Sequence, residues 1–361
     1  MQIAKECQKR GYEITVLTTS WDGEIPEGFD IKFLKSKAIS NHGKMMEFAS
    51  FVADEVKKKD YSALVSFNRI PGLDVYFAGD NCIKEKGYAE RGVFYRLTPR
   101  YKTFAELEKA VFDKDLNTQI LYLVERQKKE YQKHYLTQDY RFHLMPAGIS
   151  IERKRPANDE EIRKAMRSSL GISESAKILI QVGSGFITKG LDRSITALAS
   201  LSKEIKDITV LLVVGKGNSK NFIQLAKELG IDSNVRLLGG RTDVTNLLVS
   251  SDLMIHPAIS EATGTVLMEA LAAGLPVMCS GVCGYACYIE KAKAGIVIPE
   301  PFKQEILNEE LNKILSRNDL VQMSKNALVY TYTHQEELFS RPQKAADVIE
   351  EVIKKKRTMA D

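Results

Sequence analysis

Short apolar runs alternate with segments of helical periodicity through the second half of the chain. Six of these runs are rich in Val, Ile and Leu and are expected to be strands, at 178–182, 210–214, 235–238, 253–256, 277–279 and 296–298. Helix-length segments separate them, and the clearest runs from about Asp192 to Leu201. Continuous apolar strands joined by helical crossovers form parallel sheets that are covered on both faces. The pattern therefore predicts a parallel α/β domain.

The first half shows a less regular version of the same pattern. Strands are expected near 14–17, 31–34, 63–67, 75–78 and 142–145. Turn residues at 146–149 interrupt the pattern, so we place a linker there. A final helix over 341–357 carries an apolar stripe and is expected to join the first domain. The predicted fold class is α/β, with two Rossmann-like domains, 1–148 and 149–340, facing each other across a cleft.

The start of the chain departs from this scheme. Ile3, Ala4 and Cys7 recur at helical spacing, and Gly11 suits the end of a helix. A Rossmann-like domain normally opens with a strand and a Gly-rich turn. We therefore expect the first strand of the N-terminal domain to be missing, and an in-frame extension of roughly 20 residues, enough for one strand and a turn, to precede Met1 in the gene.

Composition and charge narrow the function classes. The 52 Lys and Arg against 47 Asp and Glu give a formal net charge of +5, too small for a dedicated nucleic-acid binder. The chain has no run of about 18 apolar residues and no apolar signal-peptide region, so a cytoplasmic location is expected. Cys279, Cys283 and Cys287 recur at four-residue spacing. Gly281 and Gly284 interrupt any helix that would align these thiols, so no metal site is expected.

The strongest candidate site lies between 256 and 277. A strand is expected to end near His256, a loop carries Glu261, and a helix is expected to begin near Gly264. The free N–H groups and the positive dipole end of such a helix favour a phosphate. Glu269 lies on the same helix, where a carboxylate suits sugar hydroxyls. The alternative is that Glu261 is a capping acid and Glu269 a solvated helix residue.

The spacing from Glu261 to Glu269 resembles the E-x7-E signature of retaining glycosyltransferases of family GT4, which have the GT-B fold. The resemblance covers nearly the whole chain and is most specific to the glucosyltransferases that act on lipopolysaccharide core. It extends through the segments 66–80, 94–98, 181–184, 189–195 and 282–286. It implies UDP-glucose as donor, a heptosylated lipid A core as acceptor, retention at the anomeric carbon, no metal, and work at the cytoplasmic face of the inner membrane.

The resemblance also implies roles for individual residues. Lys189 takes the position where a basic residue meets the leaving diphosphate, and Asp80 is expected either to contact the transferred sugar or to cap the next helix. The expected catalytic residues are Glu261, Lys189 and Asp80. The expected donor-binding residues are Arg153, Gly183, Lys189, Arg241, Ala262, Thr263, Gly264, Thr265, Val266 and Glu269. A front-face and a double-displacement mechanism both remain open.

Residues 91–141 concentrate positive charge, with eleven Lys and Arg against seven Asp and Glu. Rings and cations alternate there, which is typical of a surface on anionic headgroups. The expected membrane-contacting residues are Arg96, Arg100, Tyr101, Lys102 and Phe104. The alternative is a pair of helices packed on the domain core with a solvated face.

Two other functions remain open from the sequence. One is a GT4 hexosyltransferase that uses a different UDP-sugar or acceptor. The other is a truncated, inactive paralogue that binds nucleotide without turnover, which the absent Gly-rich loop would explain. The donor hexose, the linkage position and the oligomeric state are not predicted.

Overall fold

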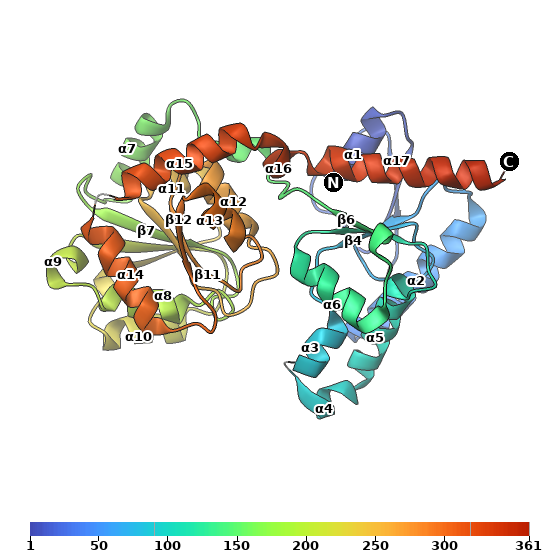
Figure 1. Ribbon diagram of the computed structural model, residues 1–361, viewed down its shortest axis with the longest axis horizontal. Helices are drawn as coiled ribbons and strands as arrows, with labels where there is room; N and C mark the ends of the chain where they lie inside the picture. Colours follow the sequence, from blue (N-terminus) through green and yellow to red (C-terminus); the bar gives the residue numbers. More distant parts are fainter. Residues whose placement is uncertain (90, 318, 361) are drawn as a thin grey trace. The chain divides into compact units, whose positions relative to one another are not determined.

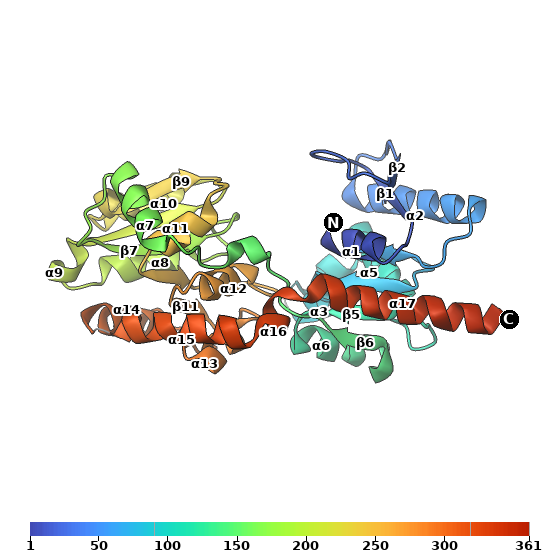
Figure 2. The ribbon, with the colours of Figure 1, turned by 90° about the horizontal axis from the view of Figure 1, so that it is seen from above.

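The computed structural model describes residues 1–89, 91–317 and 319–360. It divides into two compact units, which are Met1–Gly148 with Ser340–Asp361 and Ile149–Phe339. The chain passes between them twice, first after Gly148 and again after Phe339 (Figures 1 and 2). Each unit has its own parallel sheet system and is described by itself.

The second unit contains one six-stranded parallel sheet in the order β12-β11-β10-β7-β8-β9. Strands occur at all six predicted positions, which confirms that part of the sequence analysis. Their bounds are β7 (Lys177–Val182), β8 (Thr209–Val214), β9 (Val235–Gly239), β10 (Leu253–His256), β11 (Val277–Ser280) and β12 (Gly295–Ile298). Every residue of β10 and β11 is buried, as expected for strands covered on both faces.

Helices connect and cover these strands. Three of them, α8, α10 and α14, share one apolar core with strand residues such as Leu179, Leu211 and Leu253. The helices of the unit are α7 (Asp159–Ser169), α8 (Leu191–Ala199), α9 (Lys203–Lys206), α10 (Lys220–Glu228), α11 (Val244–Ser250), α12 (Thr265–Ala272), α13 (Ala286–Ala292), α14 (Gln304–Ser316), α15 (Asp319–Thr333) and α16 (Gln335–Phe339). Short 3₁₀ turns lie at η2 (Ile151–Arg153) and η3 (Asp232–Asn234).

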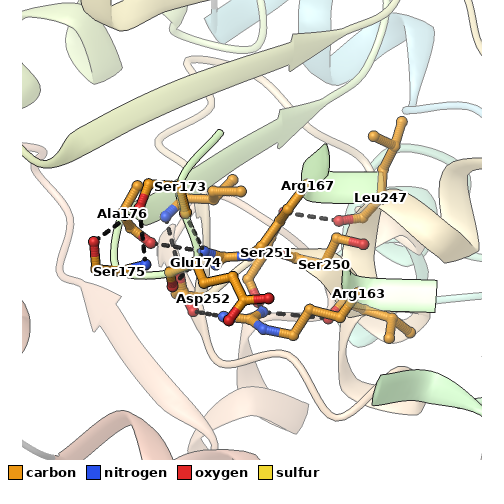
Figure 3. Close-up of polar contacts among 12 residues, drawn as sticks. Arg163, Arg167, Ser173, Glu174, Ser175, Ala176, Leu247, Ser250, Ser251 and Asp252 are labelled. Atoms are coloured by element: carbon orange, nitrogen blue, oxygen red, sulfur yellow. Dashed lines mark hydrogen bonds and ion pairs between the residues drawn. The ribbon is translucent and has the colours of Figure 1, made fainter. Parts of the chain in front are cut away.

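An ionic cluster fastens α7 to the amino ends of β7 and β10 (Figure 3). The Asp252 carboxylate accepts hydrogen bonds from Arg163 Nη2 at 2.5 Å, Arg167 Nη2 at 2.7 Å and the backbone N–H of Ile178 at 2.7 Å. The Arg167 side chain is only 2% exposed and also donates to four backbone carbonyls. The cluster therefore ties the start of two neighbouring strands to one helix.

The first unit has its strands in two separate parallel sheets, β1-β2 and β3-β4-β5-β6. The strands are β1 (Ile14–Thr18), β2 (Phe29–Phe33), β3 (Val65–Ser66), β4 (Val75–Ala78), β5 (Gln119–Tyr122) and β6 (Phe142–Leu144). Strands thus occur near all five predicted positions, and the sequence analysis missed β5. A helix, α1 (Gln2–Lys9), precedes β1, as expected from the spacing of Ile3 and Cys7.

The first unit also contains several further helices. They are α2 (Asn41–Lys58), α3 (Ile83–Ala89), α4 (Gly92–Arg96), α5 (Pro99–Phe112), α6 (Glu125–Tyr135) and α17 (Arg341–Ala360), with a 3₁₀ turn η1 (Asp139–Arg141). Helix α17 lies beside α1 in both views, and Arg10 joins them by ion pairs with Asp347 and Glu350 at 2.8 and 3.0 Å (Figures 1 and 2). Across the described residues, no helix combines the length and apolar character needed to span a bilayer.

Candidate active site

The strand order of the second unit reverses beside β7, the first strand of its sheet. The next strand in sequence, β8, lies on one side of β7, and β10 lies on the other. The connections that leave the carboxyl ends of β7 and β10 therefore diverge, and such a switch point is where open α/β sheets bind ligands. These two connections carry Lys189 and Glu261, respectively.

Backbone contacts join the two loops directly. The carbonyl of Thr188 accepts hydrogen bonds from the N–H groups of Ile259 and Ser260, at 2.9 and 3.3 Å. Gly190 has a φ of +64°, and a Cβ at this position would lie 2.1 Å from the carbonyl oxygen of Pro257. Only glycine allows this approach. The position of Lys189 relative to Glu261 is therefore fixed by the chain itself.

Lys189 lies over a glycine and forms an ion pair with Glu261 through its Nζ. A Cβ on Gly183, which has a φ of +149°, would lie 3.3 Å from carbons of the Lys189 side chain. Gln181 fixes the backbone behind the lysine by donating a hydrogen bond to its carbonyl at 2.8 Å. Because Gly183 has no side chain, the aliphatic part of the Lys189 side chain can lie over it and reach the carboxylate of Glu261.

Glu261 is a strongly stabilised carboxylate. Burial by itself would raise its pKa, but hydrogen bonds from His256 and Lys189 outweigh burial and lower the pKa to about 2. Nε2 of His256 lies 3.4 Å from Glu261 Oε2. Because its pKa is so low, Glu261 is ionised across the physiological range and can accept hydrogen bonds but not donate them.

His256 belongs to this cluster, and the sequence analysis did not single it out. Its side chain is fully buried. Within the described residues, its Nδ1 has no hydrogen-bond partner. The available signal was positional, because His256 is the last residue of β10 and the loop with Glu261 follows directly.

Helix α12 begins where the sequence analysis expected it. Gly264 is the N-cap residue with a φ of +84°, and no side chain caps the helix there. The first N–H groups of a helix have no acceptor within it, so those of Thr265 and Val266 are available to an anion. The two preceding loop residues, Ala262 and Thr263, are half-buried.

Arg153 and Glu269 are brought together at this site. Nε of Arg153 lies 3.4 Å from Glu269 Oε1, and its Nη1 donates to Thr245 Oγ1 at 3.2 Å. Burial raises the pKa of Glu269, while the positive charge of Arg153 opposes the rise. Arg153, predicted as a donor-binding residue, therefore neutralises the second carboxylate of the E-x7-E pair in this structure.

Arg241 lies apart from these contacts. It follows the edge strand β9 and forms a two-pronged ion pair with Asp243, with distances of 2.8 and 2.6 Å. Over residues 1–89, 91–317 and 319–360, no hydrogen bond or ion pair joins Arg241 to Lys189, Glu261 or Glu269. Its role in donor binding remains a prediction.

Asp80 belongs to the first unit, in the loop that follows β4, and its side chain is exposed. The alternative that Asp80 caps the next helix is wrong. The backbone N–H groups of Ile83 and Lys84, at the start of α3, donate instead to the carboxylate of Glu108 at 2.7 and 3.2 Å. The carboxylate of Asp80 is therefore left for another role.

The predicted membrane-contacting residues divide into inner and outer positions. Tyr101 is wrong for this role, because it is only 8% exposed and its ring packs against Gly87 and Tyr95. Arg100 and Lys102 are exposed, and Phe104 is half-buried with Arg100 over its ring. The helical period places Tyr101 on the core side of α5 and its neighbours toward solvent.

The same region exposes apolar side chains outside the five expected membrane-contacting residues. Val93, Phe94 and Leu97, on and after α4, are 59%, 88% and 61% exposed. Arg96 lies over the ring of Tyr88, 4.1 Å from its centroid, which extends this mixed face onto α3. The prediction of an interfacial surface therefore shifts from Tyr101 toward Phe94.

The three cysteines at four-residue spacing lie on the segment from β11 to α13. Cys279 and Cys283 are buried and Cys287 is exposed. In the part of the chain that the structure describes, no group of three His, Cys, Asp or Glu side chains is arranged to hold a metal ion.

Comparisons with known proteins identify relatives of this chain. A family model described as glycosyl transferases group 1 matches residues 162–329, which include the Lys189 and Glu261 loops. The lipopolysaccharide glucosyltransferase WaaG of Escherichia coli strain K12 is 44% identical over 350 residues, covering 97% of this chain and 93% of the relative. The chain belongs to the WaaG family of glycosyltransferases. A crystal structure of WaaG matches with a TM-score of 0.90 at 44% identity and covers 97% of this chain and 94% of that one.

Membership of the WaaG family identifies the fold as GT-B and the chain as a glycosyltransferase. More distant structures share the fold alone. Anabaena HepE, solved in complex with UDP-glucose, matches with a TM-score of 0.68 at 14% identity, covering 96% of this chain and 100% of that one.

Proposed function

We propose that this member of the WaaG family transfers glucose from UDP-glucose to a heptose of the lipopolysaccharide inner core, with retention at the anomeric carbon. One observation carries the proposal. The ion-paired Lys189 and Glu261 lie on the two joined loops at the switch point of the sheet, and the uncapped amino end of α12 follows directly. The similarity to the lipopolysaccharide glucosyltransferase WaaG supports lipopolysaccharide as the acceptor. The structure of HepE in complex with UDP-glucose supports UDP-glucose as the donor.

The positively charged groups of this site bind the donor diphosphate. The N–H groups of Thr265 and Val266 donate hydrogen bonds to the phosphate oxygens, and the ammonium of Lys189 balances the charge that grows as the UDP oxygen departs. These groups supply the positive charge that a metal ion would otherwise bring, so we propose metal-independent transfer.

The two glutamates hold sugar hydroxyls. Glu261, held ionised by Lys189 and His256, accepts hydrogen bonds from the transferred glucose. Glu269 accepts hydrogen bonds from the ribose while Arg153 balances its charge. We also propose that Asp80 contacts the transferred sugar.

The acceptor is attached to a membrane lipid, which gives the exposed face of α4 and α5 a role. We propose that Phe94, Arg100 and Lys102 contact anionic headgroups at the cytoplasmic face of the inner membrane. A surface cation contributes about 1 kcal/mol to such binding, so the association is reversible. Cosedimentation with anionic vesicles should weaken as salt rises and should weaken further in Phe94→Ser, whereas salt-independent binding would contradict this part of the proposal.

Release of UDP and formation of a glucosylated product test the main proposal. Purified protein should turn over UDP-glucose with a heptosylated core acceptor, and added chelator should not reduce the rate. UDP-galactose and UDP-N-acetylglucosamine in parallel reactions identify the hexose. Turnover with one of these and not with UDP-glucose would reassign the donor. A crystal soaked with UDP that shows the nucleotide away from Gly264 and Lys189 would overturn the site.

A further inference from the structure

A buried polar cluster holds the loop that carries Asp80. From α6, Gln127 Nε2 donates to the carbonyls of Ala78 and Asp80 at 3.2 and 3.3 Å. One turn further along the helix, the hydroxyl of Tyr131 donates to the same Asp80 carbonyl at 3.0 Å. Two side chains of one helix therefore converge on a single backbone oxygen.

The far side of the loop is held from two other elements. Arg69 Nη2 donates to the carbonyl of Asn81 at 2.9 Å and to Tyr131 Oη at 2.9 Å. Glu108, on α5, accepts from the N–H groups of Ile83 and Lys84. Each end of the loop is thus bonded through a fully or nearly fully buried side chain.

This arrangement is costly for a structural link. Arg69 and Glu108 are 8% and 0% exposed, with Nε and Oε2 3.4 Å apart, and a buried ion pair is often no more stabilising than apolar residues of the same size. Burial raises the pKa of Tyr131 well above its ordinary value, so the hydroxyl keeps the proton that it donates. The cluster is therefore better explained by its effect on the conformation of the loop than by a gain in folding free energy.

The side chain that this loop presents is left unengaged. Asp80 is exposed, and in the described ranges its carboxylate accepts no hydrogen bond and joins no ion pair, although its carbonyl accepts two hydrogen bonds. The backbone of Asp80 is therefore held in place while its carboxylate has no such partner in those ranges. A reactive group that is positioned before the substrate binds requires both conditions.

We propose that Tyr131 is a positioning residue that acts in glycosyl transfer by fixing the Asp80 carboxylate through the Asp80 carbonyl. This inference rests on the proposed function, because it takes Asp80 to contact the transferred sugar. Tyr131 itself touches no substrate. The residues proposed to bind the donor belong to the second unit, so we expect its effect on kcat and not on donor affinity.

Tyr135 offers a matched control on the same helix. It is also buried and, like Tyr131, stacks on Phe112, but its hydroxyl donates to Glu108, and among the described residues it makes no hydrogen bond to Asp80. We expect Tyr131→Phe to lower kcat by about tenfold to a hundredfold, as expected for a slightly misplaced reactive group, with the KM for UDP-glucose and the affinity for UDP unchanged. Tyr135→Phe acts on the loop only through Glu108 and should lower kcat much less.

A double-mutant comparison separates positioning from general destabilisation. In an Asp80→Asn background, Tyr131→Phe should cause no further loss, because the group that it positions has gone. An equal loss in both backgrounds, or equal values of kcat for Tyr131→Phe and Tyr135→Phe, would overturn the inference. Wild-type protein without transferase activity would instead refute the proposed function.

If Tyr131→Phe does not fold, Gln127→Met tests the same contact. Methionine has a similar length and removes the donor to the Asp80 carbonyl without placing a carboxyl group at a fully buried position. We expect the same loss of kcat with donor KM unchanged. An unchanged kcat in this variant would also overturn the inference.

Discussion

Opposite ends of β7 and β10 carry charged clusters that are built in different ways. At the amino ends, Arg163 and Arg167 converge on Asp252 and extend their remaining N–H groups to backbone carbonyls (Figure 3). At the carboxyl ends, Lys189 and Glu261 pair with each other on loops shaped by glycines. In the amino-end cluster, the arginine N–H groups are therefore bonded mainly to backbone carbonyls. In the carboxyl-end cluster, the two charged side chains are bonded to each other.

The difference distinguishes charges that stabilise from charges that bind. A guanidinium bonded to four carbonyls has no donor to offer a ligand, and its removal leaves those carbonyls unpaired. An ammonium paired with one carboxylate can share its three N–H groups with an incoming phosphate. Burial alone does not make this distinction, since Asp252 and Glu261 are 20% and 13% exposed.

Asp252→Ala should give the largest effect on stability. The substitution leaves Arg167 as an uncompensated buried charge and removes the acceptor of the Ile178 N–H, so we expect a loss of about 3 to 5 kcal/mol in unfolding free energy. Chemical denaturation followed by circular dichroism measures it. The folded fraction should bind UDP with unchanged affinity.

Asp243→Ala is the matched control for this prediction. Its ion pair with Arg241 is as short, but the two side chains are 29% and 36% exposed, so solvent screening leaves only a small expected loss. Equal losses in the two variants would show that the amino-end cluster is not a special anchor of the sheet.

The sequence predicts the carboxyl end of this sheet better than the amino end. Apolar runs locate β10 within its true bounds, and Gly264 marks the start of α12, because both signals are local. The Asp252 cluster joins residues more than 70 positions apart and has no local signal. For the same reason the pairing of Arg153 with Glu269 was not predicted.

In the first unit, the errors have two local causes. Strand β5 was missed because Glu125 begins a helix only three residues after Tyr122, so the segment lacks the turn that marks most strand ends. Tyr101 was assigned to a surface on composition, whereas its place in the helical period of α5 turns it toward the core. Period, more than composition, decides which ring is exposed.

The contribution of the carboxyl-end cluster to the unfolding free energy should depend on pH. Glu261 has its pKa lowered from about 4.5 to about 2 by folding, so its ionised form contributes stability above pH 4.5 that is lost as the pH falls toward 2. The contribution is about 3 kcal/mol in full and about half of that near pH 3. We expect the difference in unfolding free energy between wild type and Glu261→Gln to shrink in this window. A difference that is constant from pH 6 to pH 3 would contradict the role of Lys189 and His256.

Lys189→Met tests the role of this lysine in nucleotide binding. Loss of a charged hydrogen bond to the diphosphate should weaken UDP binding by about 2 kcal/mol, or roughly thirtyfold. Isothermal titration calorimetry with UDP measures the change. Lys203→Met, on α9, removes an exposed lysine and serves as the control. If both variants bind UDP equally well, Lys189 does not meet the diphosphate.

Glu269→Gln should give the smallest effect and the most specific one. The amide keeps one acceptor for the ribose but loses the charge, so UDP should bind more weakly by about 1 kcal/mol. The loss should disappear when 2′-deoxy-UDP replaces UDP if the 2′-hydroxyl is the group held by Glu269. Arg153→Met should leave the carboxylate of Glu269 without its positive partner. This negative charge lies in the same unit as the proposed diphosphate site, so the binding of both nucleotides should weaken alike. A Glu269→Gln effect of the same size on both nucleotides would transfer the ribose contact to another residue and leave Glu269 as the partner of Arg153 alone.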